Sequence, residues 1–269
     1  MQLYQCILYN NDCYQMNTMM KPKRIIVHST GAPNPALSRY VQPTAYQVTG
    51  MGGRTREEMM NLLGKNKFDN HWNQPNLKVA VHAFIGKLAN GNVATVQTLP
   101  YNIPAWGVGK GFKGSFNGSA VQVECCEDDL KSKTYFKNVY DEAVEFCAMI
   151  CKKYNIPVEN VISHKEAHKL GYGSNHGDID HWLKKFGLTM DDFRKAVDKK
   201  LNGSTLPYQV KVTVDKLNIR KGPGTKYDIV GSITDRGVYT ITEVNGNWGQ
   251  LKSGKGWICL KGYTEKYKD

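Results

Sequence analysis

A change of sequence pattern at residues 202–207 most constrains how this chain folds. The stretch NGSTLP there consists of small and turn-forming residues, which is typical of a linker. Before it, strand-like runs alternate with longer stretches of helical periodicity, whereas after it short strand-like runs are separated by turns such as Gly222-Pro223-Gly224. The 269 residues therefore predict two domains, 1–201 and 208–269, joined by this linker.

Strands and helices alternate through the first domain. The apolar run at 24–28, the alternating run at 120–125 and the run at 160–163 each predict a strand. Between the last two, apolar residues three to four positions apart predict a long helix over 133–154. These elements predict an α/β domain. The other expected elements are helices at 55–63 and 189–201 and a hairpin of strands at 79–85 and 93–97, after an irregular segment at 1–22.

The second domain contains short strand-like runs with turn signals between them. About sixty residues with this pattern predict a small all-β barrel. The expected strands are at 210–214, 217–219, 229–233, 238–244, 249–252 and 257–259.

Composition narrows the classes of partner. A hydrophobic content of 41% and a charged content of 22% are typical of a soluble globular protein. No apolar run approaches the ~20 residues that a membrane span requires. The formal net charge of +12 indicates a polyanionic partner, either nucleic acid, an anionic membrane or an anionic cell wall. Because the basic residues are scattered and form no block, we expect no nucleic-acid partner.

The cysteines and the N-terminal sequence indicate the cellular compartment of the protein. Seven cysteines are an odd number without a framework spacing, which indicates free thiols in a reducing compartment. The N-terminus lacks a basic region followed by a sustained apolar segment, so it does not read as a secretory signal. We therefore expect a cytoplasmic protein, or one that leaves the cytoplasm by a route that the sequence does not encode.

Candidate metal ligands gather in residues 161–182, VISHKEAHKLGYGSNHGDIDHW, which hold four of the seven histidines. A short β-branched run delivers His164, and the Gly-, Ser- and Asn-rich segment that follows is expected to be loop rather than helix. Such a loop can bring His176 or Asp178 back to His164, and His28, which ends another strand, is the best additional donor. Three N/O ligands with water in the fourth position are typical of a zinc hydrolase. The spacing matches no local metal signature, and any single histidine here is more typical of a hydrogen-bonded structural residue.

Four sequence blocks follow one another in the order typical of one enzyme family. They are IIVHST, VAVHAFIGKLANGNVATVQTLP with AW after it, NGSAVQVE, and VISH…SNHGDIDHW, and they lie between about Ile25 and Phe186. In these blocks the chain resembles the zinc-dependent N-acetylmuramoyl-L-alanine amidases of the amidase-2 type, which are related to peptidoglycan-recognition proteins. Residues 210–266, with LNIRKGPGTKYDIVG and a late GWI, resemble a bacterial SH3-type (SH3b) wall-binding domain. The resemblance implies a central mixed sheet flanked by helices, followed by a small SH3-like barrel.

The resemblance also implies the roles of individual residues. His28, His164 and Asp178 match the zinc ligands, and Glu124 matches the carboxylate that activates water. His176 stands where a family lysine stabilises the oxyanion, and this departure leaves its role less certain than the others. Charge and resemblance favour Asp178 as the third ligand, although imidazole is also a common zinc ligand, so His176 stays open as the alternative.

The substrate cleft is expected to include Trp106 and His82, the latter being either cleft-lining or structural. A second departure from the family follows Trp106, where Gly107 replaces a histidine that many members carry. The histidines expected to be structural are His71, His168 and His181.

The implied activity is zinc-dependent hydrolysis of the amide between N-acetylmuramic acid and the L-alanine of the stem peptide. The resemblance is nearest to endolysins and autolysins that act on Gram-positive walls. It implies a zinc cofactor and peptidoglycan as partner, with teichoic-acid phosphates as a counter-surface for the basic second domain. We expect a monomer, and a phage-type endolysin that stays cytoplasmic until its release to the wall rather than a secreted autolysin.

Two rival functions were weighed. A cysteine amidase or peptidase would use Cys125 or Cys126 with His164. These cysteines lie in or at the end of a strand, whereas such nucleophiles usually sit at a helix N-terminus, where the thiol pKa is lowered. A non-catalytic peptidoglycan-recognition protein would keep the fold without the metal, and the presence of Asp178 favours catalysis instead.

Overall fold

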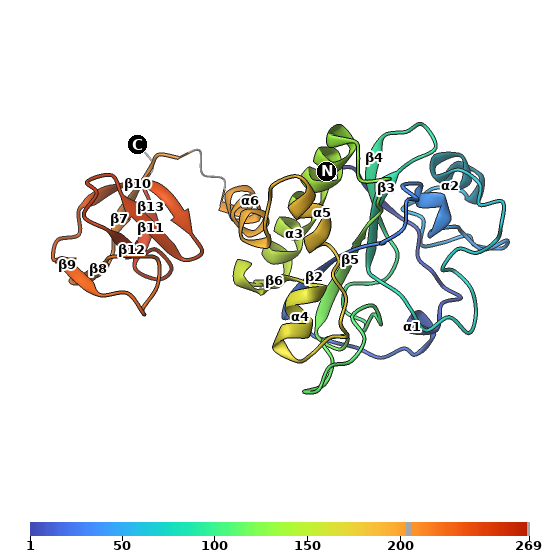
Figure 1. Ribbon diagram of the computed structural model, residues 1–269, viewed down its shortest axis with the longest axis horizontal. Coiled ribbons are helices and arrows are strands. Elements are labelled where there is room, and N and C mark those ends of the chain that lie inside the picture. The colour runs from blue at the N-terminus through green and yellow to red at the C-terminus, as the bar shows by residue number, and fades with distance from the viewer. Residues whose placement is uncertain (203–205, 268–269) are drawn as a thin grey trace. The chain divides into compact units, whose positions relative to one another are not determined.

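The computed structural model describes residues 1–202 and 206–267 of the chain and divides into two compact units, residues 1–193 and 194–269 (Figure 1). Helix α6 (Met190–Asn202) crosses this division. The domain boundary at residue 201 therefore stays a prediction. The linker predicted at 202–207 includes residues 203–205, which lie outside the described residues.

A six-stranded mixed sheet forms the centre of the first unit. Its strand order is β1-β4-β3-β5-β2-β6, and every neighbouring pair is parallel except β3 and β4. The predicted α/β fold with a mixed central sheet is confirmed. The strands are β1 (Leu3–Gln5), β2 (Arg24–Ser29), β3 (Ala83–Lys87), β4 (Val93–Gln97), β5 (Ala120–Cys125) and β6 (Val161–Ser163).

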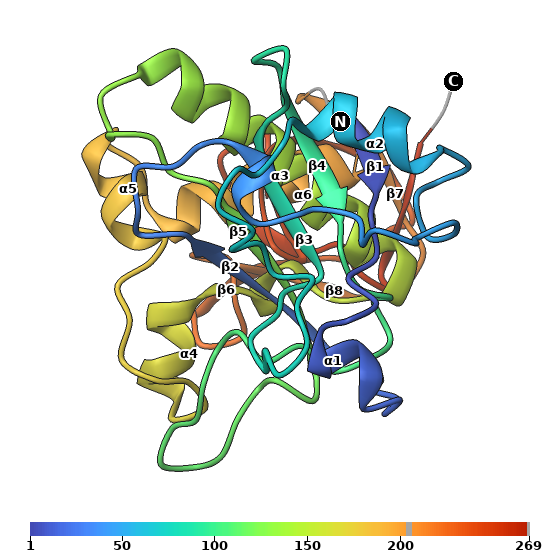
Figure 2. The ribbon, with the colours of Figure 1, turned by 90° about the vertical axis from the view of Figure 1, so that its right-hand side faces the viewer.

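Helices cover the sheet on both faces. Helix α3 (Lys133–Tyr154), which Ser132 caps, packs against β3, β4 and β5, whereas α4 (His164–Leu170) packs against β2 and β6. Figures 1 and 2 show α4 near β6 and the helices α1 and α2 toward the β4 side of the sheet. The remaining helical elements are α1 (Asp12–Gln15), η1 (Leu37–Arg39), α2 (Arg56–Leu63), η2 (Val158–Asn160) and α5 (Asp180–Lys185).

Strand register gathers polar side chains on one face of this sheet. His28 of β2 pairs in register with Glu124 of β5, and Ile26 pairs with Gln122. Because side chains alternate between faces along a strand, His28, Gln122 and Glu124 all point to the same side. Val123, between the two polar residues of β5, points to the opposite face and is fully buried.

The secondary structure departs from the predictions at three places. The Gly-, Ser- and Asn-rich residues 171–178 are loop as predicted, but α4 before them and α5 after them were not predicted; α4 starts because Ser163 and Glu166 form a capping box. The first strand of the hairpin begins at Ala83 rather than Val79, since an apolar run does not distinguish a strand from a buried connection. The N-terminal segment contributes β1 and α1, elements of three and four residues that are too short to show a periodicity.

The second unit has a seven-stranded antiparallel sheet in the order β13-β7-β10-β11-β12-β8-β9 around an apolar core. The predicted all-β SH3-like fold is confirmed, and β13 is an additional strand. The strands are β7 (Tyr208–Val212), β8 (Leu217–Arg220), β9 (Ile229–Ile233), β10 (Val238–Asn245), β11 (Trp248–Leu251), β12 (Trp257–Cys259) and β13 (Thr264–Lys266).

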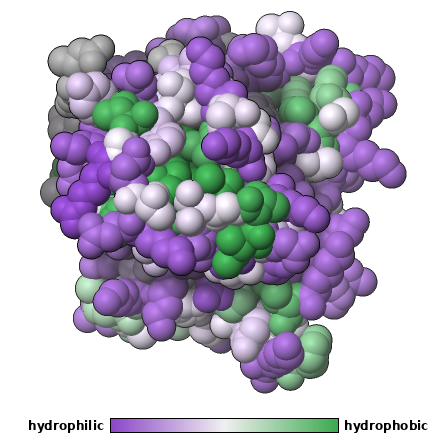
Figure 3. All heavy atoms as spheres, turned by 90° about the vertical axis from the view of Figure 1, so that its left-hand side faces the viewer, coloured by the Kyte–Doolittle hydropathy of each residue, from purple (hydrophilic) through white to green (hydrophobic). Residues whose placement is uncertain are grey.

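The surface combines hydrophilic and apolar side chains. Figure 3 shows one face of the molecule, on which apolar residues gather between predominantly hydrophilic ones. In the second unit the exposed apolar side chains include Ile229 and Val230 of β9, which is an edge strand of its sheet. Within the described part of the chain, no helix is both long and apolar enough to cross a membrane.

Candidate metal centre and active site

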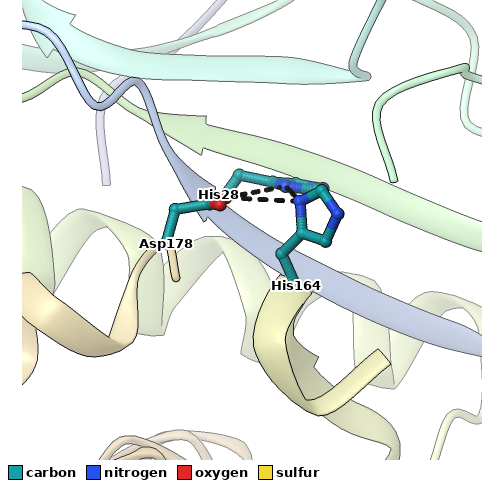
Figure 4. Close-up of side chains that lie close together, drawn as sticks. All are labelled: His28, His164 and Asp178. Atoms are coloured by element: carbon teal, nitrogen blue, oxygen red, sulfur yellow. Dashed lines mark hydrogen bonds and ion pairs between the residues drawn. The ribbon is translucent and has the colours of Figure 1, made fainter. Parts of the chain in front are cut away.

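Three side chains from separate elements converge at one point (Figure 4). His28 lies near the end of β2, His164 is the first residue of α4 after β6, and Asp178 precedes α5. His28 Nδ1 lies 3.1 Å from both His164 Nδ1 and Asp178 Oδ2. His164 Nδ1 lies 3.5 Å from the same Oδ2. Within the described residues this is the one group of three His, Cys, Asp or Glu side chains whose ligand atoms are close enough to hold a metal ion.

The triangle formed by these three atoms has the size of one face of a zinc coordination tetrahedron. Zinc binds nitrogen and oxygen at about 2.0–2.1 Å, so two ligands of a regular tetrahedron are roughly 3.3–3.4 Å apart. The observed separations of 3.1–3.5 Å bracket that value. The fourth vertex of such a tetrahedron is left for water or substrate.

Gln122 determines which nitrogen of His28 carries the hydrogen. The Gln122 amide nitrogen donates to Ala105 O at 2.6 Å and to Asn117 Oδ1 at 3.1 Å, so its oxygen faces His28. That oxygen lies 2.9 Å from His28 Nε2 and can only accept. His28 Nε2 therefore carries the hydrogen, and in the neutral ring Nδ1 carries a lone pair and no hydrogen.

Ser174 has the same effect on His164. The Ser174 hydroxyl donates to Val108 O at 3.3 Å and lies 3.1 Å from His164 Nε2, from which it accepts. His164 Nδ1 then also carries no hydrogen. Its lone pair is directed at the lone pair of His28 Nδ1 and at the Asp178 carboxylate. Three electron-pair donors this close require a cation between them, which is the reason that these residues fit zinc.

The pKa values of two of the three ligands agree with this arrangement. Burial lowers the pKa of His28 even though Asp178 opposes that shift, and this keeps the imidazole in the neutral form that binds metal. Burial alone would raise the pKa of Asp178. The contacts of the carboxylate with the His164 and His28 imidazoles outweigh it and hold the pKa of that carboxyl far below its usual range. Asp178 is therefore ionised.

Glu124 lies beside this centre on the neighbouring strand. Burial, and after it the nearby Asp178 and Glu127 carboxylates, raises the pKa of Glu124 well above its ordinary value. Its Oε2 is buried and has no hydrogen-bond partner among the residues that the structure describes. A carboxylate with a raised pKa and an open acceptor is suited to exchange a proton with a reacting group.

His176 takes a different position from the other two histidines. Its ring stacks on that of His164, with centroids 4.7 Å apart and planes 6° from parallel. Its Nδ1 lies 3.8 Å from Asp178 Oδ1, which is too long for a hydrogen bond. With 62% of the side chain exposed, His176 is beside the centre and open to solvent, whereas Asp178 Oδ2 points at the two buried imidazoles.

The two residues expected in the substrate cleft differ in accessibility. Trp106 is 40% exposed and lines a cavity of about 330 Å³. His82 is fully buried, with Nε2 donating to Ile103 O and Nδ1 accepting from the Gln122 N–H. Both ring nitrogens are thus occupied, which favours a structural role. The other residues that line the cavity are Asp12, Cys13, Gln15, Met16 and Lys78.

Sequence reasoning did not identify Gln122 or Ser174. The signal for Gln122 was available, because it lies two residues before Glu124 and so on the same face of a half-buried strand. Ser174 lies in a Gly-rich segment where the sequence gives no such signal. Two histidines expected to be structural have partners other than the three converging side chains. His71 pairs with Asp69, and His168 bonds Gly173 O.

The cysteines of the rival mechanism are poorly placed for nucleophilic chemistry. Cys125 and Cys126 are fully buried. Burial, followed by the neighbouring Glu124 carboxylate, raises the pKa of both thiols well above the ordinary value. The reactive thiolate form is therefore disfavoured at both positions.

Known proteins resemble both parts of the chain. A family model described as N-acetylmuramoyl-L-alanine amidase matches residues 18–178, and a model described as bacterial SH3 domain matches residues 215–265. The N-acetylmuramoyl-L-alanine amidase CwlA of a Bacillus species is 27% identical over 123 residues, which are 46% of this chain and 48% of that protein. This chain thus matches about half the length of that curated relative.

Solved structures of similar proteins are more distant in sequence. The PlyG catalytic domain is 23% identical, with 77% of this chain and 99% of that chain covered and a TM-score of 0.48. The hydrolase AmiA of Staphylococcus aureus is 19% identical, with 69% and 76% covered and a TM-score of 0.45.

The chain belongs to the N-acetylmuramoyl-L-alanine amidase family, because the family model covers more than half of it. The match includes His28, Glu124, His164 and Asp178, so the centre described above lies within the family domain. The predicted family and the predicted bacterial SH3 domain are both confirmed.

Proposed function

We propose that this chain is a zinc-dependent peptidoglycan hydrolase that cleaves the amide between N-acetylmuramic acid and the L-alanine of the stem peptide. The observation that carries the proposal is the convergence of three electron-pair donors, His28 Nδ1, His164 Nδ1 and Asp178 Oδ2. Beside them lies Glu124, whose Oε2 has no hydrogen-bond partner within the described part of the chain. Family membership supplies the substrate class.

Amide hydrolysis requires a nucleophile at neutral pH, a base for its proton, and positive charge opposite the developing oxyanion. His28, His164 and Asp178 would hold zinc, which would supply a Lewis acid to polarise an amide carbonyl and lower the pKa of water to about 7. Glu124 accepts the proton of the attacking water and returns it to the departing amine nitrogen. His176, which is exposed beside His164, faces the oxyanion.

Outside the reacting centre, each unit contributes to substrate binding. Trp106 and the cavity that it lines contact the muropeptide. The second unit binds the wall of a Gram-positive cell, with teichoic-acid phosphates facing its basic residues. We favour a monomeric phage-type endolysin over a secreted autolysin.

The reaction is tested by mass spectrometry of wall digests. New L-alanine amino termini without new reducing sugar ends are expected from the wild type. They should be absent after a metal chelator and absent in Glu124→Gln, and zinc should restore activity to the chelated wild type. New reducing ends would indicate a glycosidase instead, and activity that resists the chelator but fails after a thiol reagent would support the cysteine rival.

A further inference from the structure

Glu127 joins two chain segments that lead away from active-site residues. It follows β5 by two residues, three positions after Glu124. Its backbone N–H donates to the Thr30 hydroxyl at 3.0 Å, and the Gly31 N–H donates to its carboxylate at 3.3 Å. The exits of β2, which carries His28, and of β5 are thereby fixed to one another.

The third contact of Glu127 reaches the segment that carries Asp178. Glu127 Oε1 lies 2.9 Å from Nε2 of His181, in the first turn of α5. The other ring nitrogen of His181 lies 3.4 Å from Gly177 O, and its backbone N–H donates to the same carbonyl at 3.3 Å. Since Gly177 directly precedes Asp178, the imidazole bridges Glu127 to the loop of the third ligand.

The Glu127 carboxylate depends on these partners. Glu127 is only 3% exposed. A buried carboxylate is stable only when hydrogen bonds and a counter-charge replace its hydration. His181 contacts the carboxylate at 2.9 Å from the solvent side, where 41% of the His181 side chain is exposed. Trp182, the next residue, is fully buried against Phe136, so the first turn of α5 is held at two points.

We infer that the Glu127–His181 pair is a positioning device that places Asp178 relative to His28 and His164 and so sets the affinity of this site for zinc. The inference rests on the proposed function, since it takes these three residues as the zinc ligands. Neither Glu127 nor His181 contacts the metal position; each acts through the chain that carries Asp178.

The test measures zinc affinity of the purified full-length chain by competition with a chromophoric chelator. The variants are Glu127→Gln, which keeps the acceptor for Gly31, and His181→Gln, which alters a half-exposed side chain and leaves the core intact. Each should weaken zinc binding about 10–100-fold, as is typical when a partner of a ligand-bearing group is removed. The double variant should lose little more than either single variant, because both act through one contact.

Two further variants separate positioning from general destabilisation. His71→Gln breaks a similar histidine–carboxylate pair, with Asp69 at 3.0 Å, in a segment without metal ligands, and should keep wild-type zinc affinity. His181→Lys places a cation beside Glu127 and should bind zinc more tightly than His181→Gln. Thermal unfolding of the metal-free proteins shows whether the overall stability of any variant has changed.

Wild-type zinc affinity in both Glu127→Gln and His181→Gln would overturn the inference and leave the proposed function standing. An equal loss in His71→Gln would also overturn it, because the effect would then be general. A wild-type chain that binds no zinc would overturn the proposed function, and this inference with it.

Discussion

The two units differ in what they bury. The first unit encloses a set of polar and charged side chains, among them His28, Gln122, Glu127 and His164. In the second unit Asp198 of α6 is buried, and every buried side chain among the described residues 206–267 is apolar. Buried polar groups destabilise a fold unless they are paired, so a unit that retains many of them has a use for their geometry. The comparison agrees with the proposal that chemistry takes place in the interior of the first unit and wall recognition on the surface of the second.

The largest effect that tests this contrast is expected from Asp178→Ala and His176→Ala. Asp178→Ala should lose both zinc and activity, because it removes one of the three converging donors. His176→Ala should keep zinc and lose about 10²–10³-fold in turnover, as is typical when an oxyanion contact is deleted. Metal analysis and turnover on soluble muropeptide measure the two effects. Zinc retained in Asp178→Ala and lost in His176→Ala would reverse the two assignments.

The next largest effect is expected when the barrel of the second unit is deleted. Deleting residues 208–269 should leave cleavage of soluble muropeptide nearly intact and reduce lysis of whole cells much more. The reason is that all proposed catalytic groups lie in the first unit, whereas wall binding is proposed for the second. Equal losses on both substrates would show that the second unit helps to form the active site.

A smaller effect is expected from salt. The chain from Tyr208 onward contains eleven Lys and Arg against six Asp and Glu, a formal charge of +5. Exposed charges are screened over ~10 Å at 0.1 M salt. Wall binding by the full chain should therefore weaken as salt rises, while turnover on soluble muropeptide changes little. Wall binding that is independent of salt would exclude an electrostatic role for the second unit.

The smallest expected effect is a gain of stability in Glu124→Gln. A folded-state pKa raised above the unfolded value means that the ionised Glu124 carboxylate destabilises the fold at neutral pH. The neutral amide should stabilise the metal-free chain by about 1 kcal/mol, or about 2–4 °C in Tm.

The gain in Glu124→Gln has a definite pH dependence. It should be present at pH 7 and disappear below the unfolded pKa of about 4.3, where glutamate is protonated in both states. Thermal unfolding with a chelator at several pH values measures it. An equal gain at every pH would show that the charge of Glu124 is not its cause.

The residues that converge on the metal position were predictable from the sequence, because two of them end strand-like runs and the third belongs to a family motif. Of the residues that orient them, Gln122 was predictable from the alternation along its strand, whereas Ser174 and His181 were not. Ser174 and His181 act through loop and helix-start geometry, which periodicity does not encode. Helix α4 was not predicted because the glycines farther along dominated the local pattern. The residues of its capping box, Ser163 and Glu166, are nevertheless present in the sequence. Short elements such as β1 exist only through pairing with β4.

Gly107 limits how this family member can change over evolutionary time. A Cβ atom at this position would lie 2.7 Å from Gln122 Oε1 and 3.0 Å from a methyl group of Val81. A side chain at position 107 would therefore require Gln122 Oε1 to move away from His28 Nε2, from which it lies 2.9 Å. We expect positions 107 and 122 to covary among relatives. The choice of the ring nitrogen of His28 that carries the hydrogen would then be inherited through a pair of residues.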